Sequence, residues 1–235
     1  MTYSLEPIGE IRSPYTEKFA VPRQPGLVTA ATATIVLNGD YAVPETTRGL
    51  DGFSHIWVLF LFHQNLAQGW QPLVRPPRLG GNQKVGVFAT RSTFRPNGIG
   101  MSVVKLLGIE QQHQQTLLHV EGGDWVQGTP VIDIKPYVPY ADALPEAQAG
   151  FAQHAPAAAM NVRFSSAAKR SIEQLADSYP QLEQLITQVL QQDPRPAYHQ
   201  QKATDKVYGV RLYDLNVQWQ VENNENHVIN ISKAF

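Results

Sequence analysis

The sequence predicts a mainly β fold, a barrel or sandwich followed by a compact α+β appendage. Up to residue 137 the chain consists of about seven short apolar or alternating runs joined by turn signals, with no helical period. No G-x-G-x-x-G or phosphate-binding loop motif occurs, which argues against a dinucleotide-binding sheet. After a linker rich in Ala, Gln and Pro at 144–156, the apolar period changes to that of helices.

The expected strands of the first part are short. The run 53–62, FSHIWVLFLF, is about half as long as a membrane helix and is more typical of a buried strand. In 131–137, alternation places Asp133, Lys135 and Tyr137 on one face, as either an acid–base cluster or a solvated face. The other expected strands are 27–37, 85–90, 101–109 and 116–121.

Beyond the linker, two apolar stripes at helical spacing predict two helices. The first stripe comprises Ile172, Leu175, Ala176 and Tyr179, and the second comprises Leu182, Leu185, Ile186, Val189 and Leu190. Three alternating runs, 207–212, 216–221 and 227–231, predict a small antiparallel sheet with a hairpin turn at 223–226. We therefore expect a barrel domain at 1–145 and an α+β domain at 146–235.

Composition limits the chemistry and points to an anionic partner. The 235 residues include no cysteine, which excludes disulfides, thiolate zinc sites and cysteine nucleophiles. The first ten residues show no signal-peptide pattern, so we expect a cytoplasmic protein without a membrane span. The formal net charge is -1, yet 52–109 holds six Lys or Arg and no Asp or Glu. This local asymmetry is typical of a protein that meets phosphate or another polyanion, with chance as the alternative.

The segment 84–100, KVGVFATRSTFRPNGIG, is the strongest candidate site. Its expected strand leads into a loop shaped by Pro96, Gly98 and Gly100. Arginine forks suit carboxylate or phosphate, and glycines let a ligand approach the backbone. A surface hairpin with solvated charges is the alternative. The polar residues of this loop are Arg91, Ser92, Thr93, Arg95 and Asn97.

Two further segments place polar groups at expected loops or strand ends. In 19–26, two prolines and a glycine enclose Arg23 and Gln24, so this segment is a shaped loop. His63 and Gln64 follow a buried strand. There they either contact a ligand or satisfy the last carbonyls of that strand.

Several motifs together resemble the TsaA-like (TrmO) family of tRNA N6-methyltransferases. They are PRQPG, FSHIWVLFLFHQ, RPPRLGGN, GVFATRSTFRPN followed by IG, GTPVIDIKPY, QDPRPAY and DLNVQW, and they span nearly the whole chain. The resemblance implies methylation of N6 of threonylcarbamoyladenosine, next to the anticodon of tRNA, with S-adenosylmethionine as donor. It also implies a homodimer whose N-terminal domain is a single-sheeted β-barrel, unlike other methyltransferase folds, with a smaller α+β C-terminal domain.

The resemblance further implies which residues form the site. The donor would be bound by Pro22, Arg23, Gln24, His63, Gln64, Arg91, Met101, Asp124, Trp125, Val126 and Gln127. Arg95, Asn97, Lys135 and Tyr137 would contact the substrate, and Arg91 and Asp133 would act in catalysis without a metal. Asp133 or His63 is the candidate base for the N6 proton. Two departures from the family pattern are Gly98, in place of the second proline of RPNPIG, and Gln127, in place of the acidic residue of DGTP.

Two alternatives from other classes stay open at this point. A non-catalytic RNA-binding barrel would stack bases on Trp70, Phe94 and Trp125. A hydrolase acting on a small phosphorylated metabolite would use His63 and Asp133 as acid and base. The hydrolase would need a metal, for which the chain has no H-E-x-x-H or similar spacing.

Overall fold

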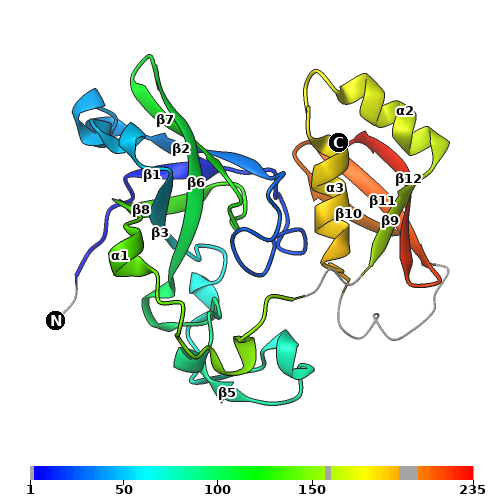
Figure 1. Cartoon of the computed structure of the whole chain (residues 1–235), viewed down its shortest axis with the longest axis horizontal. Helices are drawn as coiled ribbons and strands as arrows, with labels where there is room; N and C mark the ends of the chain where they lie inside the picture. Colours follow the sequence, from blue (N-terminus) through cyan, green and yellow to red (C-terminus); the bar gives the residue numbers. More distant parts are fainter. Residues whose placement is uncertain (1–2, 157–159, 196–205, 235) are drawn as a thin grey trace. The chain divides into compact units, whose positions relative to one another are not determined.

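A computed structural model describes residues 3–156, 160–195 and 206–234. The chain forms two compact units, which we call the barrel unit and the α+β unit (Figure 1). The barrel unit comprises Met1–Arg12, Ala33–Val120 and Gly128–Ala155, and the α+β unit comprises Ser13–Thr32, Glu121–Gln127 and Pro156–Phe235. The α+β unit therefore contains two segments, 13–32 and 121–127, that precede the predicted linker at 144–156. The domain boundary at 145 stays a prediction.

The barrel unit is built on a single closed sheet in the order β1-β2-β7-β6-β3-β8 (Figure 1). This confirms the mainly β fold with a single-sheeted barrel. The strands of this sheet are β1 (Gly9–Arg12), β2 (Thr32–Leu37), β3 (His55–Leu61), β6 (Ile99–Gln112), β7 (Gln115–Glu121) and β8 (Thr129–Pro136). The expected strand 27–37 begins only at Thr32.

Strand β3 shows why these residues form a barrel. Its side chains alternate between buried and half-buried, with Ile56, Val58 and Phe60 pointing into the core. Phe60 pairs with Gly100 on β6, where an added Cβ would lie 2.4 Å from the Phe60 ring. The absence of a side chain at Gly100 thus lets the ring fill the interior at this level.

One expected strand of the first part is wrong. Only β5 (Val85–Gly86) pairs, with the equally short β4 (Leu73–Val74), and Val87–Ala89 forms a turn of 3-10 helix. The hydroxyl of Thr90 donates to the Val87 carbonyl at 2.8 Å and closes that turn. Alternation of small and apolar residues therefore did not distinguish a strand from a short turn. A further short helix, α1 (Pro139–Asp142), follows the barrel strands.

The α+β unit has a four-stranded sheet in the order β10-β11-β12-β9 (Figure 1). Its strands are β9 (Asn161–Phe164), β10 (Tyr208–Leu212), β11 (Leu215–Glu222) and β12 (Glu225–Lys233), and its helices are α2 (Ser166–Leu175) and α3 (Leu182–Gln191). The second helix and the three antiparallel strands are as predicted. The first helix exists but lies earlier than its predicted stripe, because α2 ends at Leu175 and leaves Ala176 and Tyr179 beyond it. Strand β9, which pairs in parallel with β12, was not predicted. Asn223 and Asn224, both with positive φ, form the two-residue hairpin turn.

The core of the α+β unit combines distant parts of the chain. The buried stripe of α3, which includes Leu185 and Ile186, joins one apolar cluster with sheet residues such as Val217. Val28 and Tyr15 belong to the same cluster. Tyr15 also forms an isolated antiparallel bridge with Leu212 of β10. The segment 13–32 is therefore an integral part of this unit.

Candidate functional site

In the barrel unit, two of the predicted site segments lie side by side. The backbone N–H of Phe62, just before His63, donates to the Gly98 carbonyl at 2.8 Å. The N–H of Gln71 donates to the Phe94 carbonyl at 3.1 Å. These bonds connect the end of β3, and the segment that follows it, to residues 91–98, which we call the arginine-bearing loop and which precede β6. His63, Gln64, Arg91, Arg95 and Asn97 thus come from neighbouring segments of one unit.

The arginine-bearing loop is stabilised by its own polar groups. Arg95 Nη1 donates to the carbonyls of Thr90 and Ser92, at 3.0 and 3.3 Å. The Ser92 hydroxyl accepts from the Phe94 N–H at 3.2 Å. Part of the hydrogen-bonding capacity of Arg95 therefore serves the loop, whereas the Arg91 side chain is exposed.

Gly98 has a backbone conformation that proline, its counterpart in the family pattern, cannot adopt. Its φ is +60°, and the pyrrolidine ring fixes φ near −65°. An added Cβ at Gly98 would also lie 2.4 Å from Leu66 Cδ2. The glycine therefore permits a closely packed turn at the end of this loop.

His63 provides a direct test of whether this region fits a ligand. Its Nδ1 atom is buried and has no hydrogen-bond partner within the described part of the chain. Buried polar atoms are nearly always paired, so an open one marks a place where a ligand or water completes the bonding. The unpaired Nδ1 of His63 is therefore a candidate contact for a polar ligand such as S-adenosylmethionine.

Strand β8 brings Asp133 next to Lys135 and onto the same sheet face as Met101. Both Asp133 and Met101 pair directly with Leu59, which lies between them on β3. Asp133 Oδ2 lies 3.0 Å from Lys135 Nζ, and its Oδ1 accepts from the Ile134 N–H at 2.9 Å. The ion pair is about half exposed and contributes little to stability. In this structure both carboxylate oxygens of Asp133 therefore have a partner.

Tyr137 follows the same strand but packs on aromatic neighbours. Its ring centroid lies 5.9 Å from that of Trp57 and 6.3 Å from that of His55. Tilted and edge-on contacts of this kind fix the ring plane. The predicted face of Asp133, Lys135 and Tyr137 is thus a charged pair beside an aromatic group.

In the α+β unit, the loop 124–127 is bound to the start of segment 13–32. The Ser13 N–H donates to Gln127 Oε1 at 2.8 Å, and the Ser13 hydroxyl donates to the Trp125 carbonyl at 2.7 Å. The Gln127 N–H donates to the Tyr15 carbonyl at 2.7 Å. Gln127, which replaces an acidic residue of the family motif, therefore has a structural contact here.

The PRQPG loop is fixed to the same neighbourhood. The Gly26 N–H donates to the Gly122 carbonyl at 2.8 Å, and the Gly122 N–H donates to the Ala31 carbonyl at 2.9 Å. On the other side, Gln188 of α3 bonds to Thr29 and Ala30. The segments that carry Pro22, Arg23 and Gln24 and those that carry Asp124, Trp125, Val126 and Gln127 therefore belong to one hydrogen-bonded assembly.

Two large side chains of this assembly are buried. Trp125 is only 2% exposed and packs so closely on Gly123 that a Cβ there would meet its ring at 2.2 Å. Trp125 therefore offers no open face on which RNA bases could stack. Burial, together with the charges of Tyr213 and Asp124, raises the pKa of Tyr15 far above its usual value, so the phenol stays protonated.

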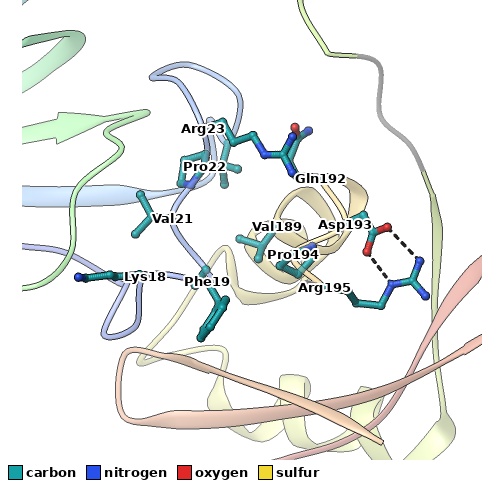
Figure 2. Close-up of a pocket in the computed structure, with 12 residues that line it drawn as sticks. Lys18, Phe19, Val21, Pro22, Arg23, Val189, Gln192, Asp193, Pro194 and Arg195 are labelled. Carbon is teal, nitrogen blue, oxygen red and sulfur yellow. Dashed lines mark hydrogen bonds and ion pairs between the residues drawn. The ribbon is translucent and has the colours of Figure 1, made fainter. Parts of the chain in front are cut away.

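The α+β unit also contains a cavity of about 240 Å³ between segment 18–28 and the end of α3 (Figure 2). Arg195, which belongs to the QDPRPAY motif, lines it and is 7% exposed. Tyr198 of the same motif lies outside the described residues. The other residues of the lining are Lys18, Phe19, Ala20, Val21, Pro22, Arg23, Val28, Val189, Gln192, Asp193 and Pro194. Lys18 lies outside the segments that the sequence singled out, whereas Phe19 begins the predicted loop 19–26 and Gln192 begins the QDPRPAY motif.

Within the described ranges, no cluster of three or more His, Asp or Glu side chains is arranged to hold a metal ion. Across the same residues, no helix combines the length and apolar character needed to cross a membrane. The closed barrel and the exposed basic loops define a β-barrel protein whose surface suits an anionic ligand.

Comparison with known proteins identifies the family. The family model for the tRNA-methyltransferase O N-terminal domain matches residues 10–143, and that for the TrmO C-terminal domain matches residues 157–234. The chain is 53% identical over 220 residues to the tRNA (adenine(37)-N6)-methyltransferase of Escherichia coli (strain K12), covering 94% of each chain. It is 51% identical over 220 residues to a Pseudomonas aeruginosa protein whose name assigns it as an S-adenosylmethionine-dependent methyltransferase, RcsF, covering 93% of each.

A solved structure agrees with these relatives. The crystal structure of TrmO from Pseudomonas aeruginosa matches with a TM-score of 0.82 and 42% identity, covering 99% of both chains. The chain belongs to the tRNA-methyltransferase O (TrmO) family, and it is a methyltransferase. This membership decides against the non-catalytic RNA-binding barrel and the hydrolase.

Proposed function

We propose that this protein methylates N6 of threonylcarbamoyladenosine at position 37 of tRNA, next to the anticodon, with S-adenosylmethionine as donor. The observation that carries the proposal is the 53% identity to the tRNA (adenine(37)-N6)-methyltransferase of E. coli over nearly the full length of both chains. The name of the P. aeruginosa relative supports the choice of donor. The threonylcarbamoyl group and the homodimer rest on the resemblance of the motifs, and the cytoplasmic location rests on the N-terminal sequence, which shows no signal-peptide pattern.

Of the residues that the resemblance assigns to the donor, Pro22, Arg23, Gln24 and the loop 124–127 belong to the α+β unit, and His63, Gln64, Arg91 and Met101 belong to the barrel unit. The Nδ1 atom of His63, which has no hydrogen-bond partner among the described residues, suits a polar group of the donor. The exposed guanidinium groups of Arg23 and Arg91 suit a carboxylate. Bound S-adenosylmethionine would supply a methyl group on a sulfonium, which keeps the bonding electrons as the methyl carbon departs.

Residues of the protein would accept the proton from N6 and orient the substrate. Transfer forms a bond from N6 to the methyl carbon and breaks the N6–H bond, so a group must take the proton. Asp133 is our candidate, because it is a half-exposed carboxylate on the same sheet face as Met101, with its oxygens oriented toward Lys135 and the Ile134 N–H. Arg95 and Asn97 would orient the modified base or a flanking phosphate. Most of the acceleration would come from positioning, as in other in-line displacements.

Mass spectrometry of nucleosides from tRNA that lacks the N6-methyl mark tests the proposal. The purified protein would be incubated with S-adenosylmethionine and tRNA that either carries or lacks the threonylcarbamoyl group. We expect a gain of one methyl group only on threonylcarbamoyladenosine. A gain on unmodified adenosine as well would contradict the substrate, and no gain on either tRNA would contradict the reaction.

The role of Asp133 has its own test. Asp133→Asn keeps the shape but removes the basic carboxylate, so we expect the transfer rate to fall about 10²- to 10⁴-fold. Asp51→Asn, at an exposed carboxylate of the same unit, serves as the control and should leave the rate unchanged. Equal rates for the two variants would exclude Asp133 as the base.

A further inference from the structure

Residues 70–90, between β3 and β6, contain a small two-stranded sheet that is separate from the closed barrel sheet (Figure 1). We call this segment the β4–β5 hairpin. Its strands pair antiparallel, with Leu73 opposite Gly86 and Val74 opposite Val85. Val74 is buried and Val85 half-buried, so their face packs on the protein. Leu73 points to the other face, where it is 51% exposed and Gly86 has no side chain to cover it.

Two aromatic side chains beside this ladder are open to solvent. Phe88 is 79% exposed and Trp70 is 57% exposed. The N–H of Val87 donates to the Pro72 carbonyl at 3.0 Å, which brings the backbones next to Phe88 and Trp70 to the same end of the hairpin. The residue after Trp70 donates its N–H to the Phe94 carbonyl at 3.1 Å, so this end adjoins the arginine-bearing loop. Exposed apolar side chains that gather in one place mark an interaction site.

The charge of the hairpin is entirely positive. Arg75 directly follows β4 and Lys84 directly precedes β5, so the two flank the same end of the ladder. Both side chains are exposed, and neither is paired with a carboxylate among the described residues. Arg78, at the turn, instead donates to the His154 carbonyl. Because 52–109 contains no Asp or Glu, an anion at Arg75 and Lys84 meets no competing carboxylate from this stretch.

The hairpin is held in place by contacts at both of its ends. The turn of 3-10 helix at Pro77–Leu79 lies against a second such turn at Gly150–Ala152. At the other end, Phe88 lies inside the turn that the Thr90 hydroxyl closes on the Val87 carbonyl at 2.8 Å. A surface that is ordered before binding loses less conformational entropy when a partner arrives.

The chemistry of this surface fits single-stranded RNA. Bases of unpaired nucleotides stack on exposed aromatic side chains, and their phosphates are attracted by nearby cations. A duplex hides the faces of its bases, so the partner must contain an unpaired stretch. Lys84 and Phe88 are four residues apart, a span of at most about 14 Å of backbone. Several successive nucleotides, rather than one, would therefore occupy the hairpin.

We propose that the β4–β5 hairpin binds unpaired nucleotides of the tRNA anticodon loop that flank the methylated base, with bases stacked on Phe88 and Trp70 and phosphates near Arg75 and Lys84. The identity of the RNA rests on the proposed function. Because the hairpin adjoins the arginine-bearing loop, it would hold the flanking nucleotides while that loop contacts the modified base.

Fluorescence anisotropy of a labelled anticodon stem–loop RNA with the full-length protein, without S-adenosylmethionine, tests the stacking. We expect Phe88→Ala to weaken binding on the order of tenfold, because a stacked base is lost. Phe88→Tyr keeps an aromatic ring and should bind normally, whereas Phe88→Leu keeps only apolar bulk and should bind as weakly as Phe88→Ala. Trp70→Ala should weaken binding as well. Tyr140→Ala, at a side chain that is 94% exposed outside the hairpin, is the control and should bind like the unsubstituted protein.

A second pair of variants tests the charge. Lys84→Glu should weaken binding of the stem–loop and reduce its dependence on salt. Arg12→Glu, at an exposed position of β1 in the closed sheet, makes the same change of charge outside the hairpin and should weaken binding less. A fully base-paired RNA duplex should bind Phe88→Ala and the unsubstituted protein equally, because it offers no free base.

Two kinds of result would overturn the proposal. One is unchanged binding of the stem–loop in both Phe88→Ala and Lys84→Glu. The other is unchanged RNA binding in Phe88→Ala together with a loss of self-association in light scattering, or of binding to phosphatidylserine vesicles. Such a result would assign the surface to a second copy of the chain or to a membrane.

These measurements also separate the hairpin from the catalytic proposal. If the protein transfers no methyl group but Phe88→Ala still weakens binding of the stem–loop, the proposed function fails and the RNA contact stands. If methyl transfer occurs and the hairpin variants bind RNA normally, the RNA contact alone fails.

Discussion

Gln188 of α3 accepts a hydrogen bond from the backbone N–H of Ala30, with Oε1 at 2.9 Å from the nitrogen. Its Nε2 donates to the Thr29 hydroxyl at 3.1 Å. One side chain of the C-terminal half thus fixes the backbone that leads out of the PRQPG loop. Because Pro22, Arg23 and Gln24 belong to that loop, Gln188 is a positioning residue for the proposed donor site.

Replacing Gln188 by Leu keeps its size and removes both hydrogen bonds. The Ala30 N–H, in a residue that is 3% exposed, loses its acceptor, so we expect a loss of about 1–3 kcal/mol in unfolding free energy. The affinity for S-adenosylmethionine should fall as well, measured by calorimetry. Gln184→Leu, one turn earlier on the exposed side of α3, is the control. Equal effects of the two substitutions would show that Gln188 has no special role.

Gly98 provides a test of the arginine-bearing loop. Gly98→Ala combines a positive φ with a contact between the new Cβ and Leu66. Gly80→Ala has the same backbone strain, with φ of +70°, but open space around its Cβ. We expect a cost of about 1–2 kcal/mol for Gly80→Ala, and a further 1–3 kcal/mol for Gly98→Ala, in urea denaturation. Similar values would mean that Leu66 moves aside freely.

The Asp193–Arg195 pair should be costly to break from one side. The side chains are 12% and 5% exposed, and the Asp193 hydrogen bond raises the pKa of Arg195. Asp193→Asn removes one negative charge from beside the buried guanidinium, and we expect a loss of up to about 3–5 kcal/mol in unfolding free energy. Adding Arg195→Met should recover part of that loss. Strict additivity of the two substitutions would contradict a coupled buried pair.

The exposed cluster at the end of β12 predicts a weak pH dependence. Hydrogen bonds from Lys233, at 2.6 Å, and from the Tyr179 hydroxyl lower the pKa of Asp214 below its ordinary value of 3.8. The resulting stabilisation is fully present above that value and is lost as the pH falls through the lowered pKa of the folded protein.

Solvent screening keeps the Asp214 effect small, because the carboxylate is exposed. Asp214→Asn should lower the urea midpoint slightly at pH 7, and the difference should vanish at about pH 2. High salt should reduce it as well. A difference that grows as the pH falls would reverse the sign of this argument.

The helices and strands that were predicted correctly are those whose apolar pattern lies within one short stretch of sequence. Alternation along β3 and the stripe of α3 each report one buried face, and both are confirmed. Strand β9 has only four residues and depends on its parallel partner β12, so no local pattern identifies it. In 85–90 the alternation was local too, but without a long partner strand it produced a turn.

The residues of the candidate site also fall into those that sequence motifs identify and those that only long-range contacts reveal. Motifs and loop chemistry named residues such as Arg23 and Asp133, whose roles stay predictions. The contacts of Gln188 and Ser13 with the loops could not be predicted, because they join segments more than a hundred residues apart.

The bridge between Tyr15 and Leu212 has a consequence for synthesis on the ribosome. The two residues are about 200 positions apart, so the segment 13–32 leaves the exit tunnel long before its partners in α3 and β10 exist. Until then Tyr15, Val28 and Ala30 have no core in which to pack. A nascent chain that stops near residue 145 would therefore expose these apolar side chains and invite binding by chaperones.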